Sequence, residues 1–452
     1  TALPAPEDQI RAEVIREFDR TGQARWSSAD LRLVPVGRGR PRNLVVVMLE
    51  SMRAKSTSMH TPGLATTPYL ESIVRKGLLV EDMSAVIPRT AAAWVAILGG
   101  QYPLTNEGTA IWAAERGRGA PDMRGLPGAL GALGYATAFF SPAHVGLLND
   151  RELLQALGFD SLFTHRDLGA GDEPDANYFG PADEVMVKPV LEWTRQQIEQ
   201  GKPFMKAIMT NVGHHPYEPP AHWPRIEFGK NLDRRLNNYY NCLRYVDGVL
   251  QQIMQGYEEL GVLDNTVFVF VGDHGQMFGE HRLWQSFNSI YEPALRVPAI
   301  VYAPGMLAGG QAVTGARQQV DLFPTMVELL GMRAEGARLP GQSLLEPVEP
   351  DRAIFFSTSI ESTYLGMRRG QRKYVYSFER DPVAVYDLAQ DAQEAAPLAS
   401  VSGDELEEAR RSLVEWKAQV ETSAYGHPAR SYRPARSWAD DPSERRTLPD
   451  NR

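Results

Sequence analysis

Cysteine and positive charge are both scarce in this sequence. Cys242 is the single cysteine among 452 residues, which excludes an intramolecular disulfide, a cysteine zinc cluster and a CxxC redox pair. Lys and Arg number 47 against 56 Asp and Glu, for a formal charge of −9. This balance gives no electrostatic basis for binding nucleic acid or an anionic membrane. An anionic ligand would therefore need local binding groups such as a metal, an arginine or a helix end.

Long apolar runs and an initial methionine are also missing from the sequence. No run of about 18 apolar residues appears, so the sequence predicts no transmembrane helix. The printed chain opens with Thr1 instead of methionine, and no signal-like apolar core follows. We interpret this as the removal of an upstream signal or membrane segment. On this interpretation the protein is extracytoplasmic, periplasmic or on the cell surface, and would contact a membrane only through a segment absent from this chain.

Apolar residues make up 43% of the sequence, enough for a large core. The run Asn43–Leu49, NLVVVML, is typical of a parallel strand buried on both faces. Similar runs with helical segments between them occur at 135–140, 203–210, 266–274 and 298–303. Alternating strands and helices predict an α/β fold with a doubly wound, mostly parallel sheet. Ligands of such sheets gather beyond the carboxyl ends of the strands.

The sequence predicts four parts. A charged amphipathic helix is predicted at 6–21 and is followed by a polar linker. After about residue 345 the sequence pattern changes to one typical of short strands with turns, and a helix is predicted near 403–423. The last residues are rich in Arg, Pro, Ser and Asp. We predict an N-terminal helix and linker at 1–42, a main domain at 43–345, a smaller C-terminal α+β subdomain at 346–424 and a tail at 425–452.

Three polar clusters directly follow buried strands: Glu50, the pair His214-His215 and the pair Asp273-His274. A single cluster of this kind is usually a solvated strand end. Three on one sheet edge favour a site, because that edge is where these folds bind ligands. Glutamate, aspartate and histidine together suit a divalent ion such as Mn²⁺, Zn²⁺ or Mg²⁺.

Thr90 stands between a proline-containing turn and a helix predicted at 91–98, which Gly99 and Gly100 end. Threonine is a favoured helix N-cap, which would explain it without any chemistry. A metal bound to its hydroxyl would instead lower the hydroxyl pKa and make Thr90 a nucleophile. The two roles are compatible, and we expect Thr90 to serve as both.

Two segments closely resemble sulfatases of the alkaline phosphatase superfamily. The first is 239–284, which ends in VGDHGQMFGEHRLW, and the second is 366–399, which is similar to the C-terminal subdomain of those enzymes. With 43–53 and the Thr90 stretch, the resemblance covers about residues 43–400. It implies an alkaline phosphatase-like fold.

The nucleophile position departs from the sulfatase pattern. In sulfatases a cysteine that becomes formylglycine lies thirteen positions before a proline, and here Thr90 lies thirteen positions before Pro103. Trp94 replaces the arginine that follows four places later, and Gln285 and Ser286 stand where an anion-binding lysine is expected. These departures weaken an inference of formylglycine-dependent sulfatase activity.

With threonine at this position, the sequence resembles the lipoteichoic acid synthase and phosphoethanolamine transferase branches. Those enzymes use a threonine nucleophile and one divalent metal. That resemblance implies Mn²⁺ first, with Zn²⁺, Mg²⁺ or Ca²⁺ as alternatives. It implies that His214 and Arg151 contact the transferred phosphate group; His215 is interpreted as a neighbouring surface residue. The implied metal ligands are Glu50, Thr90, Asp273 and His274.

The leading hypothesis is a metal-dependent phosphotransferase or phosphodiesterase that forms a phospho-threonine intermediate on a lipid- or glycan-linked phosphodiester. The first alternative is a sulfatase-like hydrolase of sulfate or phosphonate esters. The second is a superfamily member without catalytic activity that binds an anionic glycan. Retention of all four ligand types favours an enzyme.

Overall fold

The computed structural model describes residues 6–37, 39–105, 124–144, 150–169, 177–359, 364–377 and 380–425. Its central sheet contains β2 (Asn43–Leu49), β3 (Leu78–Ser84), β4 (Ala136–Phe140), β5 (Ser161–Phe163), β6 (Phe204–Met209), β7 (Thr266–Gly272), β8 (Arg296–Tyr302), β9 (Gln311–Val313) and β10 (Arg317–Gln318). The strand order is β10-β3-β8-β7-β2-β6-β4-β5, with β9 beside β3. The predicted α/β fold with a mostly parallel sheet is confirmed. Only β8 among the predicted strands runs antiparallel to its neighbours, β3 and β7.

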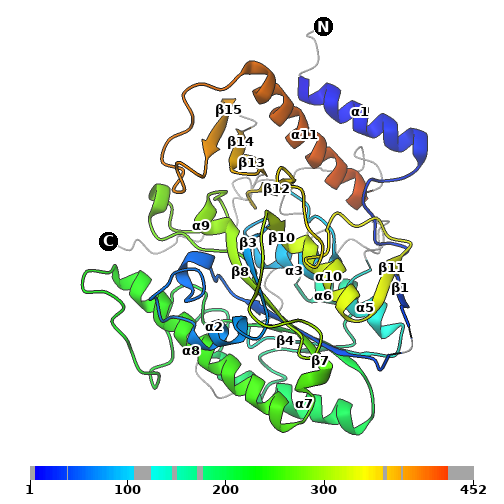
Figure 1. Cartoon of the computed structure of the whole chain (residues 1–452), viewed down its shortest axis with the longest axis vertical. Helices are drawn as coiled ribbons and strands as arrows, with labels where there is room; N and C mark the ends of the chain where they lie inside the picture. The colour runs from blue at the N-terminus through cyan, green and yellow to red at the C-terminus, as the bar shows by residue number, and fades with distance from the viewer. Residues whose placement is uncertain are drawn as a thin grey trace, which may run out of the picture.

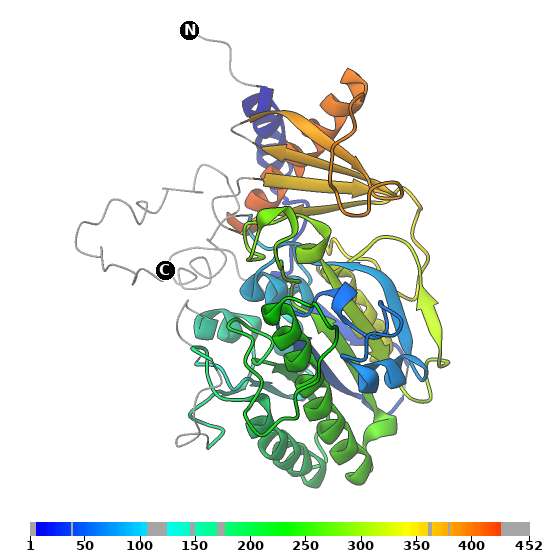
Figure 2. The same cartoon turned by 90° about the vertical axis from the view of Figure 1, so that its left-hand side faces the viewer.

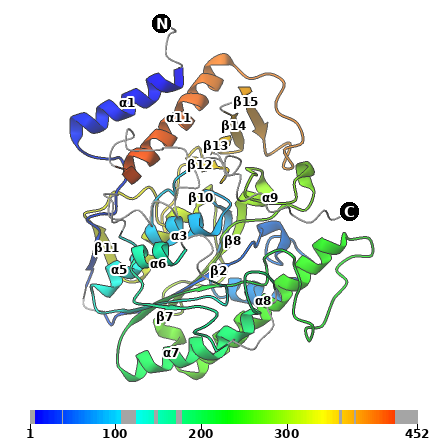
Figure 3. The same cartoon turned by 180° about the vertical axis from the view of Figure 1, so that it is seen from behind.

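Helices cover both faces of this sheet (Figure 1, Figure 3). One face carries α3 (Thr90–Gly99), α5 (Leu126–Gly131), α6 (Asp150–Leu157) and α10 (Leu322–Leu329), and the other carries α2 (Pro68–Val74), α7 (Val187–Glu199) and α8 (Arg234–Glu259). Side chains of β2 alternate between the two cores: Val46 packs toward α3, and Val47 packs toward α8. Each strand therefore needs apolar residues at successive positions, which is the pattern of a sheet buried on both sides.

A separate antiparallel sheet lies beyond one end of the central sheet (Figure 2). It consists of β12 (Ala353–Ser357), β13 (Tyr364–Arg369), β14 (Arg372–Ser377) and β15 (Arg380–Asp387), in that order. Helix α11 (Gly403–Tyr425) packs on it, as predicted for a C-terminal α+β subdomain. The short α9 (Glu292–Leu295) lies between the two sheets, where it contacts β14 through an ion pair.

The N-terminal helix α1 (Pro6–Thr21) lies along α11 (Figure 1). Ion pairs join the two helices, including Arg11 to Glu421 at 3.0 Å and Arg410 to Glu7 at 3.1 Å. The stretch predicted as a linker contains β1 (Arg32–Pro35), which pairs antiparallel with β11 (Met332–Glu335). It is therefore partly ordered by a strand that its polar composition did not indicate. The predicted tail lies outside the described residues after position 425.

No helix within the described ranges is both long enough and apolar enough to cross a membrane.

Candidate active site

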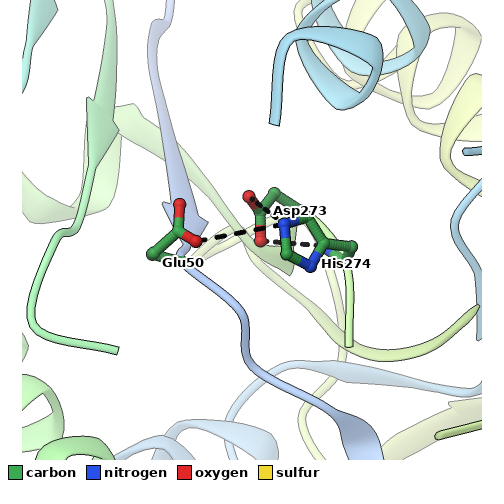
Figure 4. A group of neighbouring side chains, drawn as sticks. All are labelled: Glu50, Asp273 and His274. Atoms are coloured by element: carbon green, nitrogen blue, oxygen red, sulfur yellow. Dashed lines mark hydrogen bonds and ion pairs between the residues drawn. The ribbon is translucent and has the colours of Figure 1, made fainter. Parts of the chain in front are cut away.

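Adjacent parallel strands place the first two predicted site residues side by side. Strands β2 and β7 pair in register through their last residues, Leu49 and Gly272, and Glu50 and Asp273 follow directly. His274 comes next, with its Nε2 atom 3.5 Å from Asp273 Oδ2 and 3.9 Å from Glu50 Oε1. The three side chains converge (Figure 4), and their ligand atoms lie within 4.8 Å of one another. All three are buried.

Hydrogen bonds from backbone N–H groups and from a hydroxyl group orient these carboxylates. The backbone N–H groups of Ser51 and His274 donate to Asp273 Oδ1 at 2.8 and 2.7 Å. Ser51 Oγ donates to Glu50 Oε1 at 2.7 Å. Ser51 has a φ of 54°, a left-handed conformation that residues other than glycine rarely adopt. This backbone shape lets one residue hold both acids, so that the remaining oxygen of each faces the same point.

The donor set fits a divalent cation. His274 Nδ1 donates to the carbonyl of Gly275 at 2.7 Å, so Nε2, the other ring nitrogen, is the atom that faces the two carboxylates and can bind a cation. Burial and the neighbouring Asp273 raise the pKa of Glu50 well above its usual value. Two carboxyl groups and one imidazole nitrogen therefore face the same point, and oxygen and imidazole ligands suit Mn²⁺, Zn²⁺ or Mg²⁺.

Thr90 completes this group. Its hydroxyl donates to Asp273 Oδ2 at 2.8 Å and lies 3.3 Å from Glu50 Oε2. The prediction that Thr90 is the N-cap is wrong: Arg89 occupies that position, and no side chain caps α3. Thr90 is the first helical residue, and its hydroxyl is engaged by the carboxylates instead of the helix backbone. The predicted end of the helix is confirmed, since Gly100 adopts a left-handed conformation with a φ of 62°.

A cavity of about 370 Å³ opens over these residues. His214 lines it, with Nδ1 donating to the carbonyl of His215 at 3.0 Å and its ring 4.2 Å from that of Phe179. Burial lowers the pKa of His214 to about 4, so the ring is neutral at pH 7 and its Nε2 is a proton acceptor. The exposed ring of Tyr178 packs edge-on against His214 at 5.3 Å. His215 lines the same cavity and is exposed.

The remaining candidates lie as follows. Arg151 is the second residue of α6 and is exposed; it is not among the described residues that line the cavity. His281 stacks on Tyr291 at 3.6 Å and contacts the carbonyl of Gln393 at 2.9 Å, so it is engaged away from the carboxylates. Gln285 and Ser286 both line the cavity, and Ser286 Oγ lies 3.2 Å from His274 Nδ1. Cys242 is buried in α8.

Sequence reasoning missed several residues of this site. Ser51 and Arg89 could have been noticed because each is the chain neighbour of a candidate ligand, Glu50 and Thr90 respectively. Tyr178 and Phe179 had no comparable signal, since they belong to a loop that follows no predicted strand and meets His214 only in the fold.

Comparisons with known proteins identify the family of this chain. Residues 42–332 match the family model described as Sulfatase. Choline-sulfatase of Rhizobium meliloti is 31% identical over 178 residues, which cover 38% of this chain and 34% of that protein. Lipoteichoic acid synthase 2 of Bacillus subtilis is 24% identical over 327 residues, or 68% of this chain and 48% of that protein. The chain thus spans at most about half the length of these two relatives.

The fold also has counterparts among solved structures. A protein of the alkaline phosphatase superfamily from Vibrio parahaemolyticus matches with a TM-score of 0.71 and 20% identity, covering 92% of this chain and 97% of that one. At this identity the likeness concerns the fold. The family match, in contrast, extends over well more than half of the sequence and contains every residue of the cluster. The chain therefore belongs to the sulfatase family.

Proposed function

We propose that the protein is a metal-dependent phosphotransferase or phosphodiesterase with Thr90 as its nucleophile. One observation carries the proposal: the Thr90 hydroxyl lies 2.8 Å from Asp273 Oδ2, inside the cluster that suits a divalent ion. The substrate would be an anionic phosphodiester linked to a lipid or a glycan. The lipoteichoic acid synthase relative supports this choice, because its match extends over 68% of the chain, against 38% for the choline-sulfatase.

The first step would transfer a phosphoryl-containing group to Thr90. A divalent ion, with Mn²⁺ proposed first, would be held by Glu50, Asp273 and His274 with the Thr90 hydroxyl, and would lower the hydroxyl pKa and offset negative charge on the phosphate. Thr90 Oγ1 attacks phosphorus, the new P–O bond forms and the bond to the leaving oxygen breaks. The hydroxyl proton ends on the leaving oxygen, with Asp273 Oδ2 as its first acceptor.

The second step would release Thr90. A sugar hydroxyl or water attacks the same phosphorus, and the P–O bond to Thr90 breaks. His214 is proposed to contact the phosphate oxygens and steady the leaving group from the cavity wall, while Asp273 Oδ2 takes the proton of the attacking hydroxyl. The proton then returns to Thr90. Arg151 is proposed to bind phosphate oxygens from the start of α6, a helix that packs against α3.

The second candidate is a hydrolase of sulfate esters, which the 31% identity to a choline-sulfatase favours. Formylglycine releases sulfate through its second hydroxyl. Threonine has no second hydroxyl, so an enzyme with Thr90 as its nucleophile could not release sulfate in this way. Turnover of p-nitrophenyl sulfate faster than bis-p-nitrophenyl phosphate would reverse the order of the two candidates. A purified protein without affinity for Mn²⁺ or Zn²⁺ would instead support a glycan-binding role without catalysis. The extracytoplasmic location stays a proposal.

A covalent adduct tests the proposed mechanism. Incubation with a phosphodiester donor, without an acceptor, should leave part of the donor attached to the peptide that carries Thr90, and intact-mass and peptide mass spectrometry would locate it. Thr90→Ala should lose the adduct and nearly all turnover, while Thr90→Ser should retain a measurable fraction because its hydroxyl can occupy the same place. Activity in a folded Thr90→Ala protein, or an adduct on another residue, would refute the mechanism.

A further inference from the structure

Arg89 is the one residue with a permanent positive charge among the described residues that line the cavity. The other ionisable groups of this lining are Glu50, Tyr178 and four histidines: His144, His214, His215 and His274. Burial lowers the pKa of both His214 and His215, which favours their neutral forms. Among the described residues of this lining, Arg89 is therefore the one that offers an anionic substrate a fixed cationic side chain, and Arg151 lies outside the lining.

The guanidinium of Arg89 is free to bind a ligand. Within the described part of the chain it makes no hydrogen bond or ion pair, although other arginines with comparable or greater burial are engaged. Arg352 forms a two-pronged pair with Asp321 at 2.7 Å, and Arg53 pairs with Glu280 at 2.8 Å. Arginine presents a planar fork that matches the oxygens of phosphate or sulfate. A half-buried arginine that lines a cavity and has no partner among the described residues can therefore bind an anionic ligand.

The backbone fixes where this side chain starts. Arg89 N–H donates to the carbonyl of Ile87 at 2.7 Å, and the Arg89 carbonyl accepts from Ala93 N–H at 3.0 Å. Arg89 is the extended N-cap of α3, so its Cα lies one trans peptide, about 3.8 Å, from that of Thr90. A group bound at Thr90 thus lies within reach of the guanidinium. Trp94, one turn further along α3, also lines the cavity but brings no charge.

We propose that Arg89 is a substrate-binding residue that pairs with an anionic oxygen of the substrate while Thr90 attacks the phosphorus. The inference rests on the proposed function, because it assumes that an anionic ester occupies this cavity. Removing the guanidinium should weaken binding far more than it slows a substrate that is already bound, since the contact is made in the bound ground state as well as in the transition state.

The test compares Arg89→Met, Arg89→Lys and the control Arg195→Met in the full chain loaded with Mn²⁺. Arg195 is exposed on α7 and does not line the cavity, so its substitution removes the same charge elsewhere. Calorimetric titration with inorganic phosphate and with sulfate gives Kd, and bis-p-nitrophenyl phosphate gives KM and kcat. We expect Arg89→Met to raise Kd and KM by about 10- to 100-fold, the range for losing a charge-assisted hydrogen bond, with Mn²⁺ content unchanged.

Arg89→Lys should recover part of the loss, because it keeps the charge without the fork, and Arg195→Met should match the unmodified chain. Unchanged Kd and KM in a folded, Mn²⁺-loaded Arg89→Met protein would overturn this assignment and leave the Thr90 mechanism standing. Anion binding that depends on Arg89 without any Thr90 adduct would do the reverse: Arg89 would keep its role, and the proposed mechanism would fall.

Discussion

Glu50 and Asp273 are two buried acids held beside each other, which is costly for the protein without a cation. We predict that Glu50→Gln, which keeps the shape and the acceptor for Ser51 Oγ, will make the metal-free protein at least as stable as the unmodified one. The same change should abolish stabilisation by Mn²⁺, which a bound ligand at 100 times its Kd would supply at about 2.7 kcal/mol. Thermal unfolding with EDTA and with Mn²⁺ measures both effects.

Glu184→Gln serves as the control for this substitution, since the Glu184 side chain is exposed and pairs with His222 at 3.2 Å, away from the cavity over Thr90. It should keep the full Mn²⁺ effect. A shift of the melting temperature by Mn²⁺ that survives in Glu50→Gln would contradict the ligand role of Glu50.

Residues that follow buried strands were the predictable part of this site. Glu50 and Asp273 end continuous apolar runs, so their convergence follows from strand pairing, which the structure bears out. Ser51 orients the acids through a left-handed backbone, and the Arg89 side chain lines the cavity without a partner in the described part of the chain. Neither property can be predicted from residue type or spacing, because both depend on the packing around each residue. The chemical roles of the site residues stay predictions.

At the scale of elements, Lys206 of β6 is an unusual residue in a core. It is fully buried between β6 and α7, bonds to the carbonyl of Val190 at 3.2 Å and to Thr194, and has no carboxylate partner among the described residues. Burial lowers its pKa well below the usual value. Because the unfolded chain then binds more protons than the folded one, stability should rise with pH between the folded and unfolded pKa values, by up to about 1.4 kcal/mol per pH unit.

We predict that Lys206→Met will be more stable than the unmodified chain at pH 7 and that the difference will shrink as pH rises toward 10. Urea unfolding at several pH values measures it. Lys188→Met on the exposed face of α7 should change stability by less than about 0.5 kcal/mol. An equal pH slope in the Lys206→Met and unmodified proteins would show that Lys206 stays charged in the core.

The central-sheet strands that the sequence predicted share one property, a run of apolar side chains, and the only charged residue inside such a run is Lys206 of β6. Strand β3, which was not predicted, reads LLVEDMS, and its Glu81 and Asp82 interrupt the pattern. Asp82 is tolerated because Arg296 of β8 pairs with it at 3.1 Å, a partner 214 positions away in the chain. The direction of β8 was likewise not predictable, because apolar periodicity is the same for parallel and antiparallel strands.

At the scale of the whole molecule, a network of charged side chains joins the central sheet to the C-terminal sheet. Lys373 of β14 pairs with Glu292 of α9 at 2.9 Å and with Glu394 at 2.6 Å, and Arg368 of β13 contacts Glu292 at 3.6 Å. Burial would raise the pKa of Glu292, but the surrounding lysine and arginines outweigh it and hold that pKa at about 2. This contribution to stability is complete above the unfolded pKa of about 4.3 and is lost as pH falls toward 2.

The C-terminal sheet also reaches the cavity. Ser357 N–H at the end of β12 donates to the carbonyl of Val86, in the turn before Thr90, at 3.0 Å. Ser359 N–H donates to the carbonyl of Phe287 at 2.8 Å, and Ser359 and Phe287 both line the cavity. The position of the C-terminal sheet therefore sets part of the cavity wall over Thr90, and the charged network contributes to that position.

We predict that Glu292→Gln will lower the free energy of unfolding by about 3 kcal/mol, because it leaves two buried cations without their shared acid. If the network holds the cavity wall, KM should rise. Mn²⁺ content should stay constant, because the proposed ligands Glu50, Asp273 and His274 follow strands of the central sheet. Glu408→Gln breaks an exposed pair with Arg369 on the same C-terminal sheet and should cost under about 1 kcal/mol with KM unchanged. Urea unfolding, metal analysis and steady-state kinetics of the three proteins separate these effects. A Glu292→Gln protein as stable as Glu408→Gln would show that the network does not hold the sheets together, and a stability loss without any change in KM would show that the wall is positioned by the Ser357 and Ser359 backbone contacts alone.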